Sequence, residues 1–252
     1  MKKTTKLFAA TLALGTLMVP TLAAADSVSS VTYDSNGRII FEASTDPTNP
    51  VDPTNPVDPV KPIDPINPNE PVNPTNGPLS IDFASSFDFG TQKITSTNQT
   101  YSAKAQEYEK KDKDGKVITE TGPNYVQVTD NRGTEAGWSL KVTQSNQFMT
   151  SEKDGSNELT GAEITLGGGR VVTASKSAQP NGNAAIVLTP GEEATVMDAA
   201  TGQGAGTYLL AWGTDAETGG DSVKLSVPGS TTKYAKTYAT TLTWKLSNLP
   251  AN

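Results

Sequence analysis

Proline at every third position is the feature that most restricts how this chain can fold. It recurs ten times from Pro47 to Pro74, and Pro78 follows. Proline lacks an amide N–H and fixes φ, so residues 46–78 can form neither a helix nor the interior of a sheet. Polyproline II also repeats every three residues, which would put the ten prolines on one edge of an extended helix. Residues 46–78 are therefore predicted to be a stiff linker.

An acidic residue recurs at every sixth position of the same segment, in a hexad that begins as Asp-Pro-Thr-Asn-Pro-Val and then decays. In polyproline II these acids would lie on a second edge, where they repel one another and extend the chain. At ~3.1 Å per residue, 28 residues would reach on the order of 85 Å. A ligand for a proline-binding domain is the alternative, but a spacer is favoured. The acids are Asp46, Asp52, Asp58, Asp64 and Glu70.

The first 25 residues have the pattern of a secretory signal peptide. Three lysines precede an apolar stretch over residues 7–19, and the small residues 23–25 predict cleavage after Ala25. The apolar stretch is shorter than the ~20 residues that span a bilayer, and no second long apolar run follows, so no direct membrane insertion is expected. Cleavage would leave 17 basic against 27 acidic residues, a formal charge of −10.

Composition removes most catalytic chemistry. The chain has no His and no Cys, which excludes a Ser-His-Asp triad, thiol catalysis, disulfides and His- or Cys-ligated metals. The acidic balance argues against nucleic acid as a partner. The Gly-rich stretch 202–206 lacks the features of a phosphate-binding loop, and residues 111–115 lack the distal Glu of a calcium loop, which favours a charged hairpin tip. We expect no enzyme, cofactor or metal site, and residues 249–252 do not form a sortase signal.

Two parts of the mature chain carry strand patterns. Residues 26–45 predict a short β-hairpin, because Asn36-Gly37 suits a type I′ turn. Residues 79–252 predict one all-β domain, a sandwich or barrel, with turn signals between short alternating or β-branched runs. The best helix candidate is 191–198, after Thr189-Pro190. The expected strands are 125–128, 138–143, 162–166, 170–173, 184–189, 207–212, 222–227 and 238–246.

Two of the three tryptophans lie in Trp-x-Leu units. Because residues i and i+2 of a strand point to the same face, Trp138 shares a face with Leu140, and Trp244 shares one with Leu246. Alternation with polar neighbours is typical of a buried core face. The same aromatic strip could instead stack on sugar rings, and both uses hold if a Trp edge lines a groove.

Several stretches resemble the WxL domain of Gram-positive surface proteins. Besides the two Trp-x-Leu units, these are residues 77–83, residues 87–92 and residues 128–134, together with the leading hairpin pattern and the Asp-Pro-Thr-Asn-Pro linker. The resemblance implies a non-covalent module of the cell surface that binds peptidoglycan. It also implies work within a multi-protein surface complex, alongside other WxL-system surface proteins and a membrane-anchored WxL-binding partner.

The resemblance implies specific binding residues. The binding motifs carried over by position are Trp138, Leu140, Trp244 and Leu246, and Asp130, Arg132 and Gly133 match the stretch before the first motif. The residues themselves predict a turn at that stretch, with Asp130 pairing with Arg132 or capping local amides.

Two functions remain in view from the sequence. The first is wall attachment through aromatic stacking and hydrogen bonds, with Lys233, Lys236 and Lys245 near the second motif either contacting stem-peptide carboxylates or solvated. Binding would then depend little on salt. The alternative is a structural protein-interaction component whose Trp-x-Leu strands are core and whose edges bind other surface proteins.

Overall fold

The computed structural model describes residues 30–248; the predicted signal peptide with its cleavage site, and residues 249–252, lie outside that range. The chain divides into two units at residues 40 and 41. In the first unit, described from residue 30, the predicted hairpin is wrong: no residue there is in a strand, and neither Asn36 nor Gly37 has the positive φ of a type I′ turn. A two-stranded hairpin of this length buries too little apolar surface to be stable alone.

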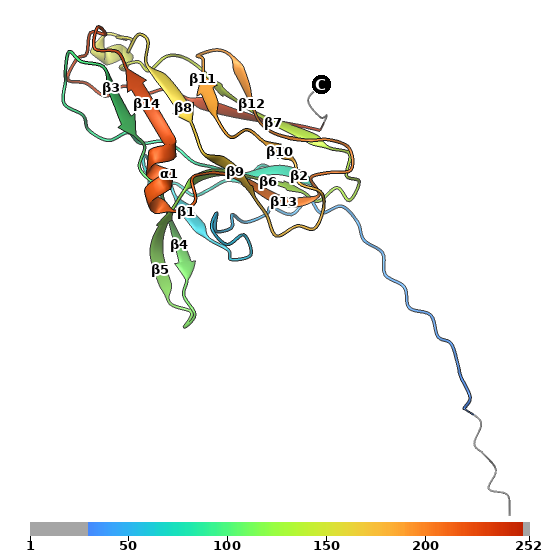
Figure 1. The fold of residues 1–252 in the computed structure, drawn as a ribbon. Helices are drawn as coiled ribbons and strands as arrows, with labels where there is room; N and C mark the ends of the chain where they lie inside the picture. Colours follow the sequence, from blue (N-terminus) through green and yellow to red (C-terminus); the bar gives the residue numbers. More distant parts are fainter. Residues whose placement is uncertain (1–29, 249–252) are drawn as a thin grey trace, which may run out of the picture. The chain divides into compact units, whose positions relative to one another are not determined.

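The second unit confirms the all-β prediction. Its strands form four antiparallel sheets in the orders β10-β12-β7-β15, β11-β8-β14-β3, β2-β6-β13-β9 and β1-β4-β5. In Figure 1 the first two sheets contribute to one layer of a sandwich and the third forms the facing layer, while the β4–β5 hairpin projects from the body. The strands are β1 (Lys61–Ile63), β2 (Leu79–Ala84), β3 (Gln99–Ser102), β4 (Gln106–Lys111), β5 (Val117–Gly122), β6 (Asn124–Asp130), β7 (Trp138–Gln144), β8 (Glu163–Leu166), β9 (Gly169–Val172), β10 (Asn181–Gly182), β11 (Ile186–Leu188), β12 (Glu193–Ala199), β13 (Gly206–Trp212), β14 (Val223–Val227) and β15 (Leu242–Ser247).

The eight predicted strands correspond to β6, β7, β8, β9, β11, β13, β14 and β15. The helix predicted at 191–198 is wrong, because that segment is β12, paired with β7. The α-helix that does form, α1 (Ala216–Ser222), begins at a capping box in which Asp215 accepts from the Thr218 amide. The charged hairpin tip is confirmed between β4 and β5. Among residues 30–248, no helix is long and apolar enough to cross a membrane.

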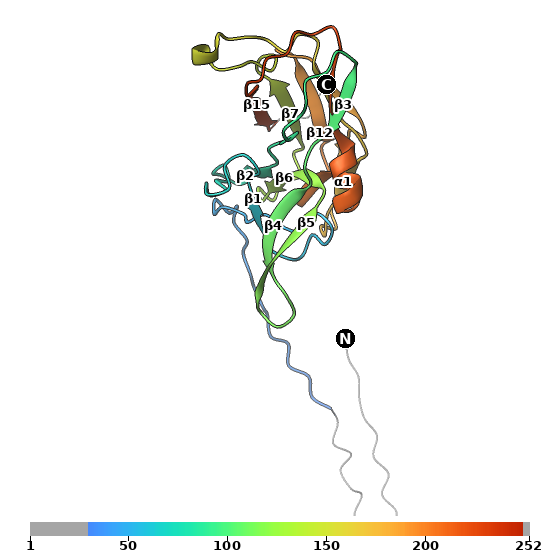
Figure 2. The same ribbon diagram turned by 90° about the vertical axis from the view of Figure 1, so that its left-hand side faces the viewer.

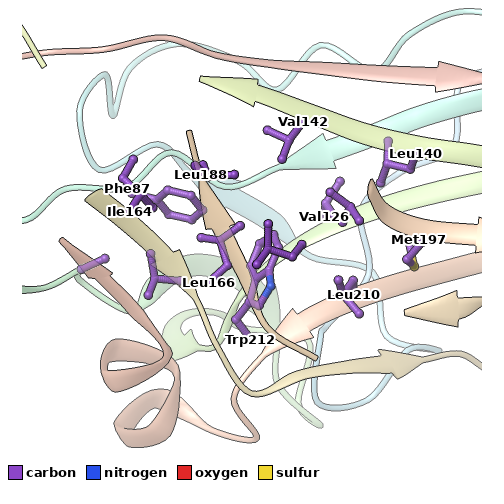
Figure 3. Close-up of a cluster of buried hydrophobic side chains, with 14 of the residues drawn as sticks. Phe87, Val126, Leu140, Val142, Ile164, Leu166, Leu188, Met197, Leu210 and Trp212 are labelled. Carbon is purple, nitrogen blue, oxygen red and sulfur yellow. The ribbon is translucent and has the colours of Figure 1, made fainter. Parts of the chain in front are cut away.

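The main core lies between the two layers of the sandwich. Val126 on β6 and Leu210 on β13 meet Leu140 and Val142 on β7 and Leu166 on β8, and all five side chains are buried (Figure 3). Each strand contributes every second residue to this cluster, as the pleat requires.

A second apolar cluster lies on the opposite face of the sheet β2-β6-β13-β9. It contains Phe83, Tyr125, Val172, Leu209 and Ala211. Every residue of β6 is consequently buried, on both faces of the sheet.

Part of the proline-rich segment covers this second face, which corrects the expectation of a free polyproline II spacer. Val51 and Val72 pack against the second cluster, and Pro50, Pro53 and Pro62 are buried. The segment even supplies β1, an edge strand paired with β4, where proline is tolerated because the missing donor can face away from the ladder. We refer to residues 50–75 as the strap.

The hexad acids fold the strap instead of extending it. Asp52 Oδ1 accepts from the Thr54 amide (2.8 Å) and hydroxyl (2.6 Å), and Asp64 Oδ1 accepts from the amides of Ile66 (2.7 Å) and Asn67 (3.0 Å). These are Asx turns, in which the aspartate carboxylate bends the chain by accepting hydrogen bonds from amides two and three residues further on. The repeat therefore encodes turns, and no straight rod forms.

Asp52 is also the electrostatic anchor of the strap. Its carboxylate is buried and accepts from Lys110 Nζ (3.0 Å) and Tyr108 Oη (3.2 Å) on β4. Burial alone would raise the pKa of Asp52, but the hydrogen bonds from Thr54 and Lys110 outweigh it and lower that pKa. The ionised carboxylate thus ties the strap to the projecting hairpin.

We predict that Asp52→Ala lowers the free energy of unfolding by about 1–3 kcal/mol, because the hydrogen-bonded groups around a buried carboxylate lose their partner. Asp58→Ala, the same position one hexad later, should change it by less than about 0.5 kcal/mol, since Asp58 is exposed. Urea denaturation of both variants tests this. The Asp52 contribution should be present above pH 3.8 and decline as the pH falls below that unfolded-state value. Equal effects of the two substitutions would contradict the anchor.

Candidate functional site

The two Trp-x-Leu units, about a hundred residues apart in the sequence, lie on neighbouring strands. β15 lies beside β7 (Figure 2) and pairs with it antiparallel. In this pairing Leu246 lies opposite Leu140 and Trp244 lies opposite Val142. Residues directly opposite in an antiparallel pair point to the same face. The two motifs therefore form one continuous apolar strip on the inner face of a single sheet.

The first motif belongs to the core. Trp138 and Leu140 are both 0% exposed, and Trp138 donates its indole N–H to the carbonyl of Gly204 (3.0 Å). Their side chains cannot touch a ligand while the domain is folded, so the structure corrects the expectation of direct peptidoglycan contact for these two residues. A buried Trp with a satisfied N–H is a structural residue.

Gly204, within the Gly-rich stretch 202–206, leaves room for the Trp138 side chain. Gly204 has φ +80°, and a Cβ there would lie 2.5 Å from Trp138 Nε1 and 2.7 Å from the Ala199 Cβ. Only glycine permits both the left-handed backbone and this close approach. Gly204 thus packs directly against the Trp138 side chain.

The stretch before the first motif forms the turn that the sequence predicts. Arg132 binds Asp130 through two parallel hydrogen bonds, Nε to Oδ1 (2.9 Å) and Nη2 to Oδ2 (2.8 Å), and Nη2 also donates to the Gly137 carbonyl (2.8 Å). The hydrogen bond to Asp130 raises the pKa of Arg132 despite partial burial. Gly133 takes φ +70° within the turn. The Arg132 side chain, bound to both Asp130 and Gly137, fixes the chain just before β7 and thereby positions Trp138.

The second motif reaches the surface. Trp244 and Leu246 are half-buried, and the Trp244 ring packs on Trp212 of β13 at 6.1 Å between centroids. The part of Trp244 that Trp212 leaves uncovered lines a groove with a volume of about 360 Å³. The other walls come from β2 and from the strap. The groove is lined by Asp64, Glu70, Pro71, Val72, Asn73, Thr75, Ile81, Asp82, Phe83, Ala84 and Trp244.

Hydrogen-bond acceptors dominate the polar side of this groove. Asp82 is buried on β2 and accepts from Ser80 Oγ (2.6 Å), Gln127 Nε2 (2.8 Å) and Thr129 Oγ1 (2.5 Å). Burial outweighs these three donors and raises the pKa of Asp82. Glu70 and Asn73 of the strap are exposed at the rim, and no Lys or Arg lines the groove. Within residues 30–248, no group of three acidic side chains is placed to hold a metal ion.

The three lysines near the second motif are engaged elsewhere. Lys233 Nζ donates to the Pro228 (2.8 Å) and Thr231 (3.0 Å) carbonyls. Lys236 pairs with Asp154 at the end of a short 3-10 helix, Glu152–Asp154. Lys245 pairs with Glu193 on the outer face of the sheet, away from Trp244. The structure brings none of these three lysines to the groove.

Sequence reasoning missed the strap side of the site. Glu70, Asn73 and Thr75 were assigned to a spacer, and Trp212 was assigned only to a strand. One signal could have found them: residues 207–212 are apolar at nearly every position rather than alternating, which is typical of a strand covered on both faces. The second face of that strand therefore had to be covered by a segment outside the sandwich.

Comparison with known proteins identifies a family. The sequence model of a family described as WxL domain surface cell wall-binding matches residues 28–250. No curated protein and no solved structure matches the chain significantly. The matched range includes the strap, both Trp-x-Leu units and the residues that precede the strap.

We predict that Gly204→Ala destabilises the domain by about 2–5 kcal/mol, from the left-handed backbone and from overpacking against Trp138. Gly202→Ala is the matched control, because Gly202 has a similar φ (+86°) but open space where a Cβ would lie. It should cost only about 1–2 kcal/mol. Urea denaturation followed by Trp fluorescence measures both, and indistinguishable variants would refute the packing role of Gly204.

Proposed function

Because the chain belongs to the WxL family of surface cell wall-binding domains, we propose that it is exported and attaches non-covalently to peptidoglycan through the groove beside Trp244. The observation that carries this is the contrast between the motifs: Trp138 is sealed in the core, whereas Trp244 is half-buried and lines a hollow. The family is one of wall-binding domains, and we propose binding without catalysis.

The groove suits a glycan chemically. Sugar rings present C–H faces that pack on an aromatic side chain, as Trp244 and the neighbouring Ile81 and Val72 permit. Glu70 and Asn73, the exposed polar residues at the rim, can hydrogen-bond hydroxyl and N-acetyl N–H groups. A volume of about 360 Å³ accommodates a ligand of one to two sugar rings.

The charge of the groove lining indicates which wall components can bind there. With three acids and no basic residue lining it, the groove favours ligands that donate hydrogen bonds and disfavours free carboxylates or phosphates. The mature chain carries an expected formal charge of −10, which also opposes polyanionic wall polymers. Glycan hydroxyl and amide groups are thus better matched than stem-peptide carboxylates.

The burial of Trp138 also favours a second candidate function, that of a protein-interaction component in which the Trp-x-Leu strands are core. In this candidate function, the chain works in a multi-protein surface complex with other WxL-system proteins and a membrane-anchored partner, as its resemblance to WxL surface proteins implies. The two functions differ in one respect, namely whether the isolated protein binds the wall.

Co-sedimentation of the mature protein with peptidoglycan stripped of teichoic acid tests the proposal. Glu70→Ala/Asn73→Ala removes two exposed polar groups from the groove. We expect about thirtyfold weaker binding, because each of the two hydrogen bonds contributes roughly 1 kcal/mol. Glu158→Ala/Ser230→Ala, in a separate polar hollow of about 510 Å³, is the matched control and should pellet as wild type. Circular dichroism melts should show all variants folded.

Two results would count against the groove. If wild type stays in the supernatant, direct peptidoglycan binding is refuted and the interaction component is favoured. If pelleting collapses when the salt concentration is raised, attachment is electrostatic and does not use stacking on Trp244.

A further inference from the structure

An exposed apolar segment lies ahead of the strap. The exposed fractions are 93% for Val31, 94% for Tyr33, 74% for Ile39, 65% for Ile40 and 85% for Phe41. Successive β-branched and aromatic residues are typical of a strand, yet no residue from 30 to 45 is in one. The family match begins at residue 28 and so includes this segment. Contiguous exposed apolar side chains of this kind mark an interaction site.

A free sheet edge lies at β15. In the described part of the chain, β15 pairs with β7 on one side and has no strand on the other. An edge strand presents unpaired N–H and C=O groups that can template another strand. Its inner face carries the half-buried Leu242, Trp244 and Leu246, and its outer face carries a single lysine, Lys245. Proteins usually protect such an edge with several charges or a proline, and this edge has little protection.

We propose that residues 38–43 of a second copy of this chain add to the free edge of β15 as an extra strand. Main-chain hydrogen bonds would supply affinity, as in other cases of strand addition. Alternation places Ile39 and Phe41 on the face of Trp244 and Leu246.

The same alternation places Arg38, Ile40 and Glu42 on the outer face, where Lys245 pairs with Glu193 (2.8 Å), so the two charged residues of the donor segment stay clear of the apolar face. The donor segment and the acceptor edge are different surfaces of one chain, so the contact is heterologous and joins copies head to tail.

Sedimentation velocity of the chain from Asp26 to Asn252, without wall material, tests this proposal independently of wall attachment. Wild type should associate between about 1 and 300 μM, the range expected for an interface of this small size. Ile39→Asp should weaken association at least about tenfold. Ile40→Asp, the adjacent identical residue on the opposite face, should change it less than about threefold. Both side chains are exposed, so neither change should alter thermal melting.

Tryptophan fluorescence locates the acceptor. Trp138 and Trp212 are fully buried, so a change in solvent exposure of a tryptophan on binding must come from Trp244. A synthetic peptide of residues 30–43 that docks at β15 should cover Trp244 and shift the tryptophan emission to the blue. Trp244→Phe should abolish the shift. A wild type that sediments as a monomer at every concentration, equal effects of the two aspartate variants, or association without the Trp244 shift would each overturn the proposal.

Discussion

The sheet β2-β6-β13-β9 is apolar on both faces, and the rest of the structure follows from the need to cover both. The facing layer of the sandwich covers one face with the core strands that carry the first Trp-x-Leu unit. The strap covers the other with Val51 and Val72. Burying two faces of one sheet gives a cysteine-free domain a larger apolar core than a two-layer sandwich of this length would have.

The same arrangement creates the candidate site. The strap ends its path beside β2, and β15 lies at the edge of the opposite layer, so the groove opens where strap and both layers meet. Trp244 connects the groove to the core through Trp212. Because the Trp244 ring is seated on a rigid core ring, it would lose little side-chain entropy on packing against a ligand.

Strand existence was predictable from the sequence because alternation and turn residues report local geometry directly. The pairing of β7 with β15 was not, since nothing in either segment encodes which other strand it meets. The prediction of a free linker failed for a different reason. Proline periodicity excludes a helix and the interior of a sheet, but it does not prevent the segment from packing against the domain. Asp52 and Val51 hold the segment against the domain. Their contacts are with Lys110 and with the cluster that contains Tyr125, residues that lie far away in the sequence. Trp138 and Trp244 have similar local sequence, and only their places in the sheet separate core from groove.

The position of the strap at the N-terminal end of the domain has a mechanical consequence. A pulling force applied from the N-terminal side loads the contacts of the proline-rich segment one after another, because the segment detaches from one end. The hydrogen bonds of Gln127 with Asn49 and Val51 come first, and the Asp52 cluster follows. The sandwich strands carry that load only after the strap has detached. Tension would therefore remove the groove wall that carries Glu70 and Asn73 while the core is still folded. The affinity of the groove for a ligand would then fall when force is applied at the N-terminal end of the chain.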